Sequence, residues 1–335
     1  MNVVLLFGGR GAEHAVSVRS AASVFSAMQE RSYRCFPIGV SKTGEFLFFQ
    51  GALSELSDGW EQHSVPICAV LREGTLAFDL PDGTTISPDL VFSVLHGKDG
   101  EDGAFQGLFT LSATPFVGSG VCASALCMNK RLCKELALYH GIPTPAFVRV
   151  RRLCEETVTR ITERLSFPVF VKPVSSGSSV GISRVTRKEE LADAILLALA
   201  ESEEAIVEEA IECSELEVAV LEKDGTLLLS PPGEIRVRGG FYDYKAKYEE
   251  DRATVTLPAP IPLWETALVK QLAATLFRLF GCRDLARVDF LRRTDGKIFF
   301  NEINTLPGFT KDSLFSRLFS LIGVDVITFL TEGRG

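Results

Sequence analysis

The chain has 335 residues, 46% of them hydrophobic and 23% charged, which is typical of a globular protein with room for roughly two to three domains. The formal net charge of -8 argues against nucleic acids and anionic membranes as partners. No apolar run approaches the ~18 residues of a membrane span. The eight cysteines contain no Cys-x-x-Cys pair and no secretory pattern precedes the first expected strand, so we expect buried free thiols in a reducing cytoplasm.

The N-terminal part predicts an open α/β sheet that binds a small molecule. Residues 3–7 have a buried-strand pattern, followed by a glycine-rich turn and a helix expected from about Glu13 to Met28. The turn lacks the G-x-G-x-x-G spacing of a dinucleotide fold. Glu13 also stands where a pyrophosphate would need a helix N-terminus without anions, so an amine is the better guest for Glu13.

The same strand, turn and helix pattern recurs twice before residue 145. A strand over residues 90–95 leads into His96 and a helix through about Leu111, and a single helix is expected from residue 121 to about His140, with Lys130 partway along. Residues 35–87 are typical of short strands. Pro143-Thr-Pro145 marks the expected start of a new region.

The next region predicts a strand over residues 168–173, a second strand towards Val185, a helix from 188 to about 201 and a strand ending at Glu209. The Gly/Ser loop over residues 174–181 lies between strands and lacks the ending of a P-loop, so we interpret it as a flap that closes over phosphates. A plain linker is the alternative. Residues 241–248, rich in tyrosine and lysine, predict an active-site lid, with an edge hairpin as the alternative.

A helix expected from Trp264 to about Phe280 precedes a predicted β-hairpin with Asp295-Gly296 at its tip. If these two residues form the turn, Asp289 lies opposite Glu302 and Arg287 opposite Asn304, all on one face. The other face would be apolar, formed by Val288, Phe290, Phe299 and Ile303. Facing carboxylates favour a hard cation such as Mg²⁺; solvated surface carboxylates are the alternative. A C-terminal helix over residues 314–321 follows.

Together these blocks resemble the D-alanine-D-alanine ligases of the ATP-grasp superfamily. The matching segments, in the family's order, are residues 7–17, 96–103, 118–125 with Lys130, Lys172 with 177–181, 241–248, 287–289 and 302–308. The resemblance implies an α/β and α+β protein, with an ATP-grasp fold and an N-terminal Rossmann-like open α/β domain. Its expected parts are residues 1–125, a central subdomain with the phosphate flap over 126–207, and a C-terminal subdomain over 208–335.

The resemblance further implies an ATP-dependent ligase that joins two D-alanines through a D-alanyl phosphate, giving D-alanyl-D-alanine, ADP and phosphate for peptidoglycan synthesis. ATP would be the co-substrate, with a pair of Mg²⁺ ions for which Mn²⁺ can substitute. Homodimerisation is carried over from the family. The Tyr-Asp-Tyr-x-x-Lys-Tyr pattern of the lid, which depsipeptide-forming relatives lack, favours an amine rather than a hydroxyl nucleophile.

The resemblance also carries roles onto matching residues. The metal ligands would be Asp289, Glu302 and Asn304. ATP would be bound by Lys130, Lys172, Ser178, Glu208, Glu215 and Lys247, with Glu217 as an alternative to Glu215 at the ribose. D-Alanine would be bound by Glu13, His96, Arg287, Gly308 and Ser313. Catalysis would fall to Glu13, Ser178, Tyr248, Arg287 and Gly308, with Arg287 and the Gly308 backbone N–H forming the oxyanion hole.

Three other readings remain open from the sequence. One is a different ATP-grasp carboxylate-amine ligase or a depsipeptide ligase. The second is a nucleotide-binding regulatory protein on the same fold, which would need a broken phosphate site. The third is a nicotinamide oxidoreductase, suggested by the first glycine turn alone.

Overall fold

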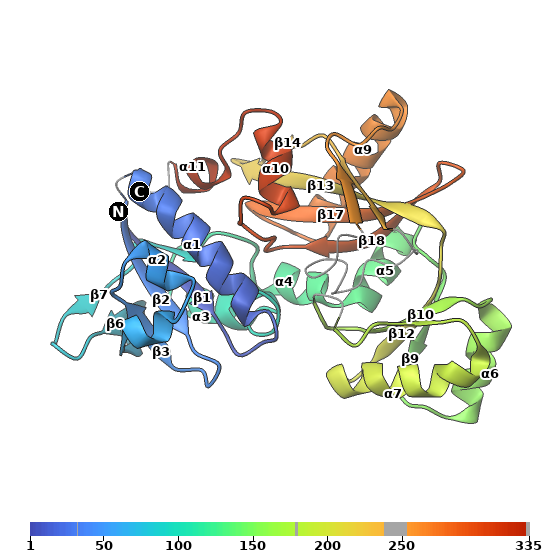
Figure 1. Ribbon diagram of the computed structural model, residues 1–335, viewed down its shortest axis with the longest axis horizontal. Coiled ribbons are helices and arrows are strands. Elements are labelled where there is room, and N and C mark those ends of the chain that lie inside the picture. The colour runs from blue at the N-terminus through green and yellow to red at the C-terminus, as the bar shows by residue number, and fades with distance from the viewer. Residues whose placement is uncertain (32, 178–179, 238–252, 333–335) are drawn as a thin grey trace.

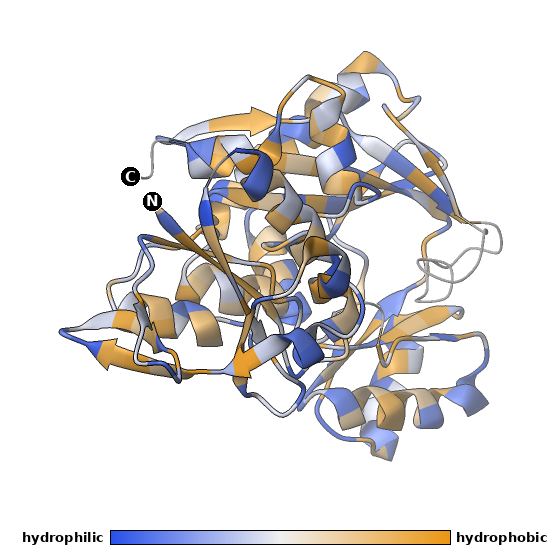
Figure 2. Ribbon diagram, turned by 60° about the vertical axis from the view of Figure 1, so that its left-hand side comes forward, coloured by the Kyte–Doolittle hydropathy of each residue, from blue (hydrophilic) through white to orange (hydrophobic). Residues whose placement is uncertain are grey.

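The computed structural model describes residues 1–31, 33–177, 180–237 and 253–332. These residues form four sheets flanked by helices, with the N-terminal part at one end of the long axis and the central and C-terminal sheets at the other (Figure 1). Hydrophobic residues follow the strands and the inner helix faces, and polar residues collect on loops and outer helix faces (Figure 2). The predicted roles of Ser178, Lys247 and Tyr248, and the lid over 241–248, lie outside the described residues.

The N-terminal sheet has the strand order β4-β3-β2-β1-β8. Its strands are β1 (Asn2–Gly8), β2 (Arg34–Val40), β3 (Phe46–Phe49), β4 (Ser64–Pro66) and β8 (Leu90–Ser93). β1 is parallel to both β2 and β8, and helix α1 (His14–Glu30) connects β1 to β2, which confirms the predicted open α/β sheet. Residues Val3 to Phe7 are at most 1% exposed, because a parallel strand covered on both faces is apolar throughout.

A smaller antiparallel sheet and short helices complete this part. The sheet contains β5 (Cys68–Arg72), β6 (Thr75–Asp79) and β7 (Thr85–Ile86). The helices are α2 (Leu53–Leu56), η1 (Trp60–His63) and α3 (Ala104–Leu111).

The single helix expected up to His140 is wrong. The segment forms α4 (Val121–Met128) and α5 (Lys130–Tyr139), separated at Asn129. The Asn129 side chain accepts a hydrogen bond of 3.0 Å from the backbone N–H of Leu132, an N-cap that begins a new helix. Lys130 therefore starts α5, and Lys134, one turn later, lies on the same buried side.

The central sheet is antiparallel, in the order β11-β10-β12-β9. Its strands are β9 (Phe147–Val150), β10 (Val169–Pro173), β11 (Ser183–Val185) and β12 (Ala205–Glu209). Its helices are α6 (Glu155–Arg164), η2 (Lys188–Glu190) and α7 (Leu191–Glu201). The loop predicted to be the flap connects β10 to β11, so its ends are fixed by paired strands.

The C-terminal sheet has the order β16-β15-β13-β17-β18, with β14 also paired to β13. Its strands are β13 (Cys213–Lys223), β14 (Thr226–Leu229), β15 (Gly233–Val237), β16 (Ala253–Thr256), β17 (Leu285–Arg293) and β18 (Ile298–Asn304). Helix α9 (Leu263–Leu279) packs on one face. Helices α10 (Leu314–Ser320) and α11 (Val326–Thr331) pack in a second hydrophobic core together with α1, β1 and residues of β13 and β17. This core ties the C-terminal sheet to the N-terminal part.

The predicted hairpin register is confirmed at the functional end. Asp289 pairs with Glu302 and Arg287 with Asn304 across β17 and β18. The predicted two-residue turn is wrong, however. The backbone N–H of Arg293 donates to the Lys297 carbonyl at 2.9 Å, which leaves three residues in the loop, and of these only Gly296 has a positive φ, of 85°.

A β-bulge restores the register that the longer turn would have shifted. Phe290 pairs with Phe300 while Asp289 pairs with Glu302, so Asn301 is an extra residue in β18. The bulge also changes which phenylalanine faces the core. Phe300 lies in the core cluster with Val288, Phe290 and Ile303, whereas Phe299, expected there, lies under Lys297, whose Nζ is 5.0 Å from the ring centroid.

All eight cysteines lie in the described part of the chain and carry free thiols, but only Cys127 and Cys133 are fully buried. The expectation of buried thiols is wrong for Cys68 and Cys122, which are exposed. None of the helices in the described ranges has the length and apolar character needed to cross a membrane.

Candidate active site

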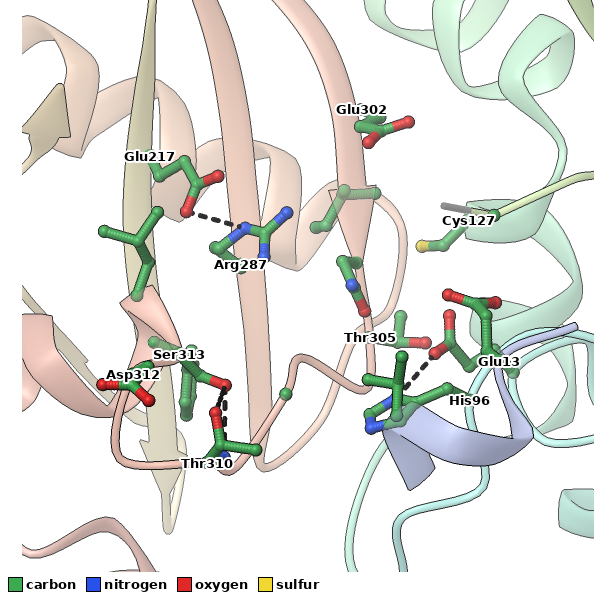
Figure 3. A pocket seen from close by; sticks show the side chains of 18 of the residues that line it. Glu13, His96, Cys127, Glu217, Arg287, Glu302, Thr305, Thr310, Asp312 and Ser313 are labelled. Atoms are coloured by element: carbon green, nitrogen blue, oxygen red, sulfur yellow. Dashed lines mark hydrogen bonds and ion pairs between the residues drawn. The ribbon is translucent and has the colours of Figure 1, made fainter. Parts of the chain in front are cut away.

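A cavity of about 850 Å³ lies where the N-terminal part, the flap and the C-terminal sheet meet (Figure 3). It is lined by parts of the chain that are distant in sequence: the start of α1, the loop after β8, the junction of α4 and α5, the flap, β13, β17, β18 and the segment leading into α10. The predicted residues that line it are Glu13, His96, Lys130, Glu217, Arg287, Glu302, Asn304, Gly308 and Ser313.

Glu13 occupies the position before the first turn of α1, at one end of the cavity. Two glycines from different segments pack against its carboxylate: a Cβ on Gly177 of the flap would lie 2.6 Å from Oε2, and a Cβ on Gly97 would also collide with it. Gly97 has a φ of 71° as well, so a side chain there would be strained. The carboxylate is thus enclosed by backbone from the flap and from the N-terminal part.

His96 lies beside Glu13 and is buried in a polar network. Its Nδ1 lies 3.3 Å from Glu101 Oε1 and 3.0 Å from the Leu306 carbonyl, and its Nε2 lies 3.1 Å from Ser20 Oγ. Burial lowers the pKa of His96, but the adjacent carboxylates of Glu101 and Glu13 outweigh it and raise the pKa above its ordinary value. The neighbouring carboxylates therefore favour the protonated imidazole more than in free histidine, and in that form it is suited to binding a carboxylate.

Glu101 is a further acidic residue of this network that was not predicted, although it lies in a segment that carries the resemblance. Burial, followed by the negative charge of Glu13, raises the pKa of Glu101. A carboxylate five residues after His96, in a glycine-rich loop that folds back on itself, was the available signal.

Arg287 is the central cation of the C-terminal wall. Its Nε and Nη2 bind Asp289 at 2.8 and 2.6 Å, and Nε is also 3.1 Å from Glu217 Oε2. Desolvation lowers the pKa of Arg287, but Asp289 and Glu217 raise it well above the ordinary value. Figure 3 shows Glu217 and Arg287 on the opposite side of the cavity from Glu13 and His96.

Gly308 and Ser313 approach each other at the bottom of the same wall. A Cβ on Gly308 would lie 2.7 Å from Ser313 Oγ, so a side chain at position 308 would displace the Ser313 hydroxyl. Ser313 precedes α10, but its hydroxyl is turned towards Thr310, with the two side-chain oxygens 2.7 Å apart and the Thr310 backbone N–H donating at 3.1 Å. A substrate carboxylate would thus meet two adjacent hydroxyl groups.

Lys130 joins the flap to the hairpin. Its Nζ donates to the Ser176 carbonyl and lies 3.9 Å from Glu302 Oε2. Lys130 is 9% exposed, so a cation is held between the start of the flap and the predicted metal ligand Glu302.

A second ion cluster lies beside Lys130 but does not line the cavity. Glu208, 1% exposed, binds Lys134 Nζ at 3.0 Å through one oxygen and Lys172 Nζ at 2.6 Å through the other. Burial raises the pKa of Glu208, but the two lysines outweigh this effect and lower it. Burial lowers the pKa of Lys134. Lys172 keeps a raised pKa because Glu208 overcomes its desolvation.

This cluster changes how two predicted ATP residues are understood. Glu208, predicted to bind ATP, has its carboxylate engaged by two lysines, so its side chain orients Lys172. Lys134 was missed, although it follows Lys130 by four residues on one helix and the spacing indicated a shared face. Glu215 and Glu217, which the sequence did not separate, differ clearly: Glu217 is 3% exposed and binds Arg287, whereas Glu215 is only half-buried.

The predicted metal ligands are neighbours on paired strands, but in the described ranges no three His, Cys, Asp or Glu side chains converge on a common centre. Asp289 faces Glu302, and the Asn304 side-chain oxygen accepts a hydrogen bond of 2.9 Å from the Leu306 N–H. Two carboxylates and an amide oxygen are suitable donors for Mg²⁺. Asp289 is 3% exposed and bound by Arg287, so the guanidinium neutralises this carboxylate in the structure.

Comparison with known proteins is consistent along the whole chain. Residues 2–119 match a family model described as the D-ala D-ala ligase N-terminus, and residues 136–332 match one described as the D-ala D-ala ligase C-terminus. The chain is 40% identical to a D-alanine--D-alanine ligase of Caldicellulosiruptor bescii over 334 residues, which cover 97% of this chain and 91% of that protein. A protein of the same name from Mycobacterium tuberculosis is 39% identical over 350 residues, covering 98% and 93%.

Solved structures of two ligases also resemble nearly the whole chain. The VanG D-Ala:D-Ser ligase from Enterococcus faecalis superposes with a TM-score of 0.89 at 36% identity, covering 98% of this chain and 97% of that one. The D-alanine-D-alanine ligase from Coxiella burnetii superposes with a TM-score of 0.86 at 29% identity, covering 98% and 91%.

Proposed function

The chain belongs to the D-alanine-D-alanine ligase family, ATP-dependent ligases that form a peptide bond on an ATP-grasp fold, and we propose that the cavity between Glu13 and Arg287 is where the two D-alanines are joined. The observation that carries this proposal is the arrangement of charge in that cavity. A carboxylate and an imidazole with a raised pKa lie at one end, and a buried guanidinium lies at the other. Such a site is complementary to zwitterionic substrates.

The first D-alanine would bind at the Glu13 end. Its ammonium group would pair with the Glu13 carboxylate, and its carboxylate would lie near the His96 imidazole. The enclosure of Glu13 by Gly97 and Gly177 supports this placement, because the flap then covers the bound substrate and excludes water that would hydrolyse an acyl phosphate.

Activation of that carboxylate would use ATP. A carboxylate is a poor electrophile, and phosphorylation both removes its charge and provides a leaving group. Lys130 and Lys172 would neutralise phosphate oxygens, with Glu208 and Lys134 fixing Lys172. Glu215 would meet the ribose, because Glu217 is taken by Arg287.

Asp289, Glu302 and Asn304 would hold Mg²⁺, with Mn²⁺ as a substitute. When bound, the metal supplies charge neutralisation on the ATP phosphates. The residues fit this purpose because carboxylates from two paired strands face each other beside the cationic Lys130.

Attack by the second D-alanine would take place near Arg287. Its carboxylate would be bound by the hydroxyls of Ser313 and Thr310. Arg287 and the Gly308 N–H would stabilise the negative charge on the tetrahedral oxygen. Removing one such preorganised donor lowers kcat about 100- to 1,000-fold. The roles of Ser178, Lys247 and Tyr248 in closing the site remain proposals from the sequence.

A second candidate reaction uses D-serine as the nucleophile. The likeness to the VanG D-Ala:D-Ser ligase supports this candidate, because VanG superposes with a higher TM-score than the Coxiella burnetii D-alanine-D-alanine ligase. The uncharged hydroxyl groups of Ser313 and Thr310 would also tolerate the hydroxymethyl side chain of D-serine.

The decisive experiment is phosphate release by the purified protein with ATP, Mg²⁺ and D-alanine, followed by mass spectrometry of products from D-alanine against D-serine and D-lactate. D-Alanine-dependent phosphate release with D-alanyl-D-alanine as the main product is expected. Absence of D-alanine-dependent release would contradict the proposal. A D-lactate product would point to the depsipeptide reaction instead.

Three further expectations belong to the proposal. The enzyme would act in the cytoplasm, where ATP is available, and supply peptidoglycan synthesis. Its parts would be residues 1–125, 126–207 and 208–335, which limited proteolysis can test. A homodimer is carried over from the family, and light scattering after gel filtration measures it.

A further inference from the structure

Three carboxylates form one row across the C-terminal sheet. Glu217 of β13 pairs with Asp289 of β17, and Asp289 pairs with Glu302 of β18. Like charges directly opposite each other on a sheet are destabilising. A cation is therefore needed in the row, and Arg287 contacts its middle residue, Asp289.

The contacts of Arg287 are divided unequally between two carboxylates. Asp289 takes Nε and Nη2 in a bidentate pair of hydrogen bonds, whereas Glu217 Oε2 lies 3.1 Å from Nε in an ion pair without hydrogen-bond geometry. The Glu217 side chain is 4% exposed and that of Arg287 is 17% exposed, so solvent screens this ion pair only weakly. Glu217 thus lies on the Nε side of the guanidinium as a buried ion-pair partner (Figure 3).

Asp289 cannot serve Arg287 and a metal ion equally well, because both compete for the same two oxygens. Glu217 is outside the proposed ligand set of Asp289, Glu302 and Asn304. It is the carboxylate that would still bind Arg287 once Asp289 is engaged elsewhere.

We infer that Glu217 is a positioning residue that keeps the Arg287 guanidinium aimed into the cavity during peptide-bond formation. This inference rests on the proposed function, in which Arg287 stabilises the tetrahedral oxygen. In this inference Glu217 acts on the reaction through Arg287. The competing roles are a third metal ligand, a ribose acceptor and a purely structural ion pair.

The test compares Glu217→Gln with a matched control. Glu265 is 3% exposed and binds Arg292 of the same strand at 2.5 and 2.9 Å, with Arg292 20% exposed. Glu265→Gln therefore removes an equally buried, arginine-bound carboxylate away from the cavity. Both proteins are measured for kcat, KM for ATP and D-alanine, melting temperature, and calorimetric affinity for Mg-ADP without D-alanine.

We expect Glu217→Gln to lower kcat about 10- to 100-fold, as is typical when a supporting carboxylate is removed. Its affinity for Mg-ADP and its KM for ATP should stay within about twofold of wild type, because it acts through Arg287 alone. The Glu265→Gln variant should show a similar melting temperature to Glu217→Gln but a wild-type kcat. In an Arg287→Ala background, adding Glu217→Gln should cause no further loss of kcat.

Each other outcome overturns the inference. A wild-type kcat in Glu217→Gln excludes a positioning role. A tenfold loss of Mg-ADP affinity identifies a metal ligand, and a raised ATP KM with normal kcat identifies a ribose contact. Equal kcat losses in Glu217→Gln and Glu265→Gln indicate a general structural effect. A wild-type enzyme without D-alanine-dependent turnover contradicts the proposed function itself, and this inference with it.

Discussion

The buried cluster of Lys134, Glu208 and Lys172 gives a prediction whose size follows from its geometry. Lys134→Met keeps the length of the side chain but removes the charge bound to Glu208 Oε1 at 3.0 Å. Removing one partner of a buried ion pair costs roughly 3–5 kcal/mol. Because Lys172 still binds the other oxygen at 2.6 Å, we expect the lower end, about 3 kcal/mol.

The assay is thermal unfolding followed by circular dichroism. Unfolding entropy scales with length, so in a 335-residue chain ~3 kcal/mol corresponds to a melting temperature lower by about 4 °C. Arg187→Met is the control, because Arg187 pairs with Glu190 on the surface with 72% of its side chain exposed. That variant should melt with the wild type.

A double variant checks the mechanism. If the cost in Lys134→Met is the buried charge of Glu208, then Lys134→Met combined with Glu208→Gln should be less destabilised than the two single changes predict together. A melting temperature of Lys134→Met within 1 °C of wild type, or simple additivity in the double variant, would refute the reasoning.

Three other variants test the site. Glu302→Gln should lower kcat by about 100-fold or more with little change in melting temperature, because several kcal/mol of charge stabilisation is lost; normal turnover would contradict its metal role. Arg287→Ala should lower kcat by about 100-fold with a small change in ATP KM; a mainly raised ATP KM would exclude the oxyanion role. Glu101→Gln should lower the pKa of His96, because Glu101 offsets its desolvation. In the proposed site D-alanine binds best when His96 is protonated, so the KM for D-alanine should rise as the pH passes the pKa of His96. In Glu101→Gln this rise should occur at lower pH, and an unchanged pH profile would exclude His96 from D-alanine binding.

Most of the element order could be predicted from the sequence because it depends on local patterns, while the roles expected of the site residues came from the family resemblance and stay predictions. The apolar run over residues 3–7, the turn before Glu13 and the strand that contains Lys172 each carry their own signal. The helix break at Asn129 also had a signal, an N-cap side chain, but the surrounding helical residues concealed it.

Other features depend on contacts between distant segments and could not be derived. The ion pair between Glu217 and Arg287 requires β13 to lie beside β17, although these two strands are far apart in the sequence. The engagement of Glu208 by Lys134 requires α5 to pack on β12. The facing of Asp289 and Glu302 was predicted correctly from an incorrect turn, because the bulge at Asn301 cancelled the error.

That bulge also separates the tip of the hairpin from the site. Asp289 pairs with Glu302 on the side of the bulge away from the tip, and β13 supports this pair from the other side of β17. Residues between Arg293 and Lys297 can thus change in number while the carboxylate row keeps its alignment. The exposed tip around Asp295 is accordingly a suitable place to insert an affinity tag or a fluorescent label that reports on the working enzyme.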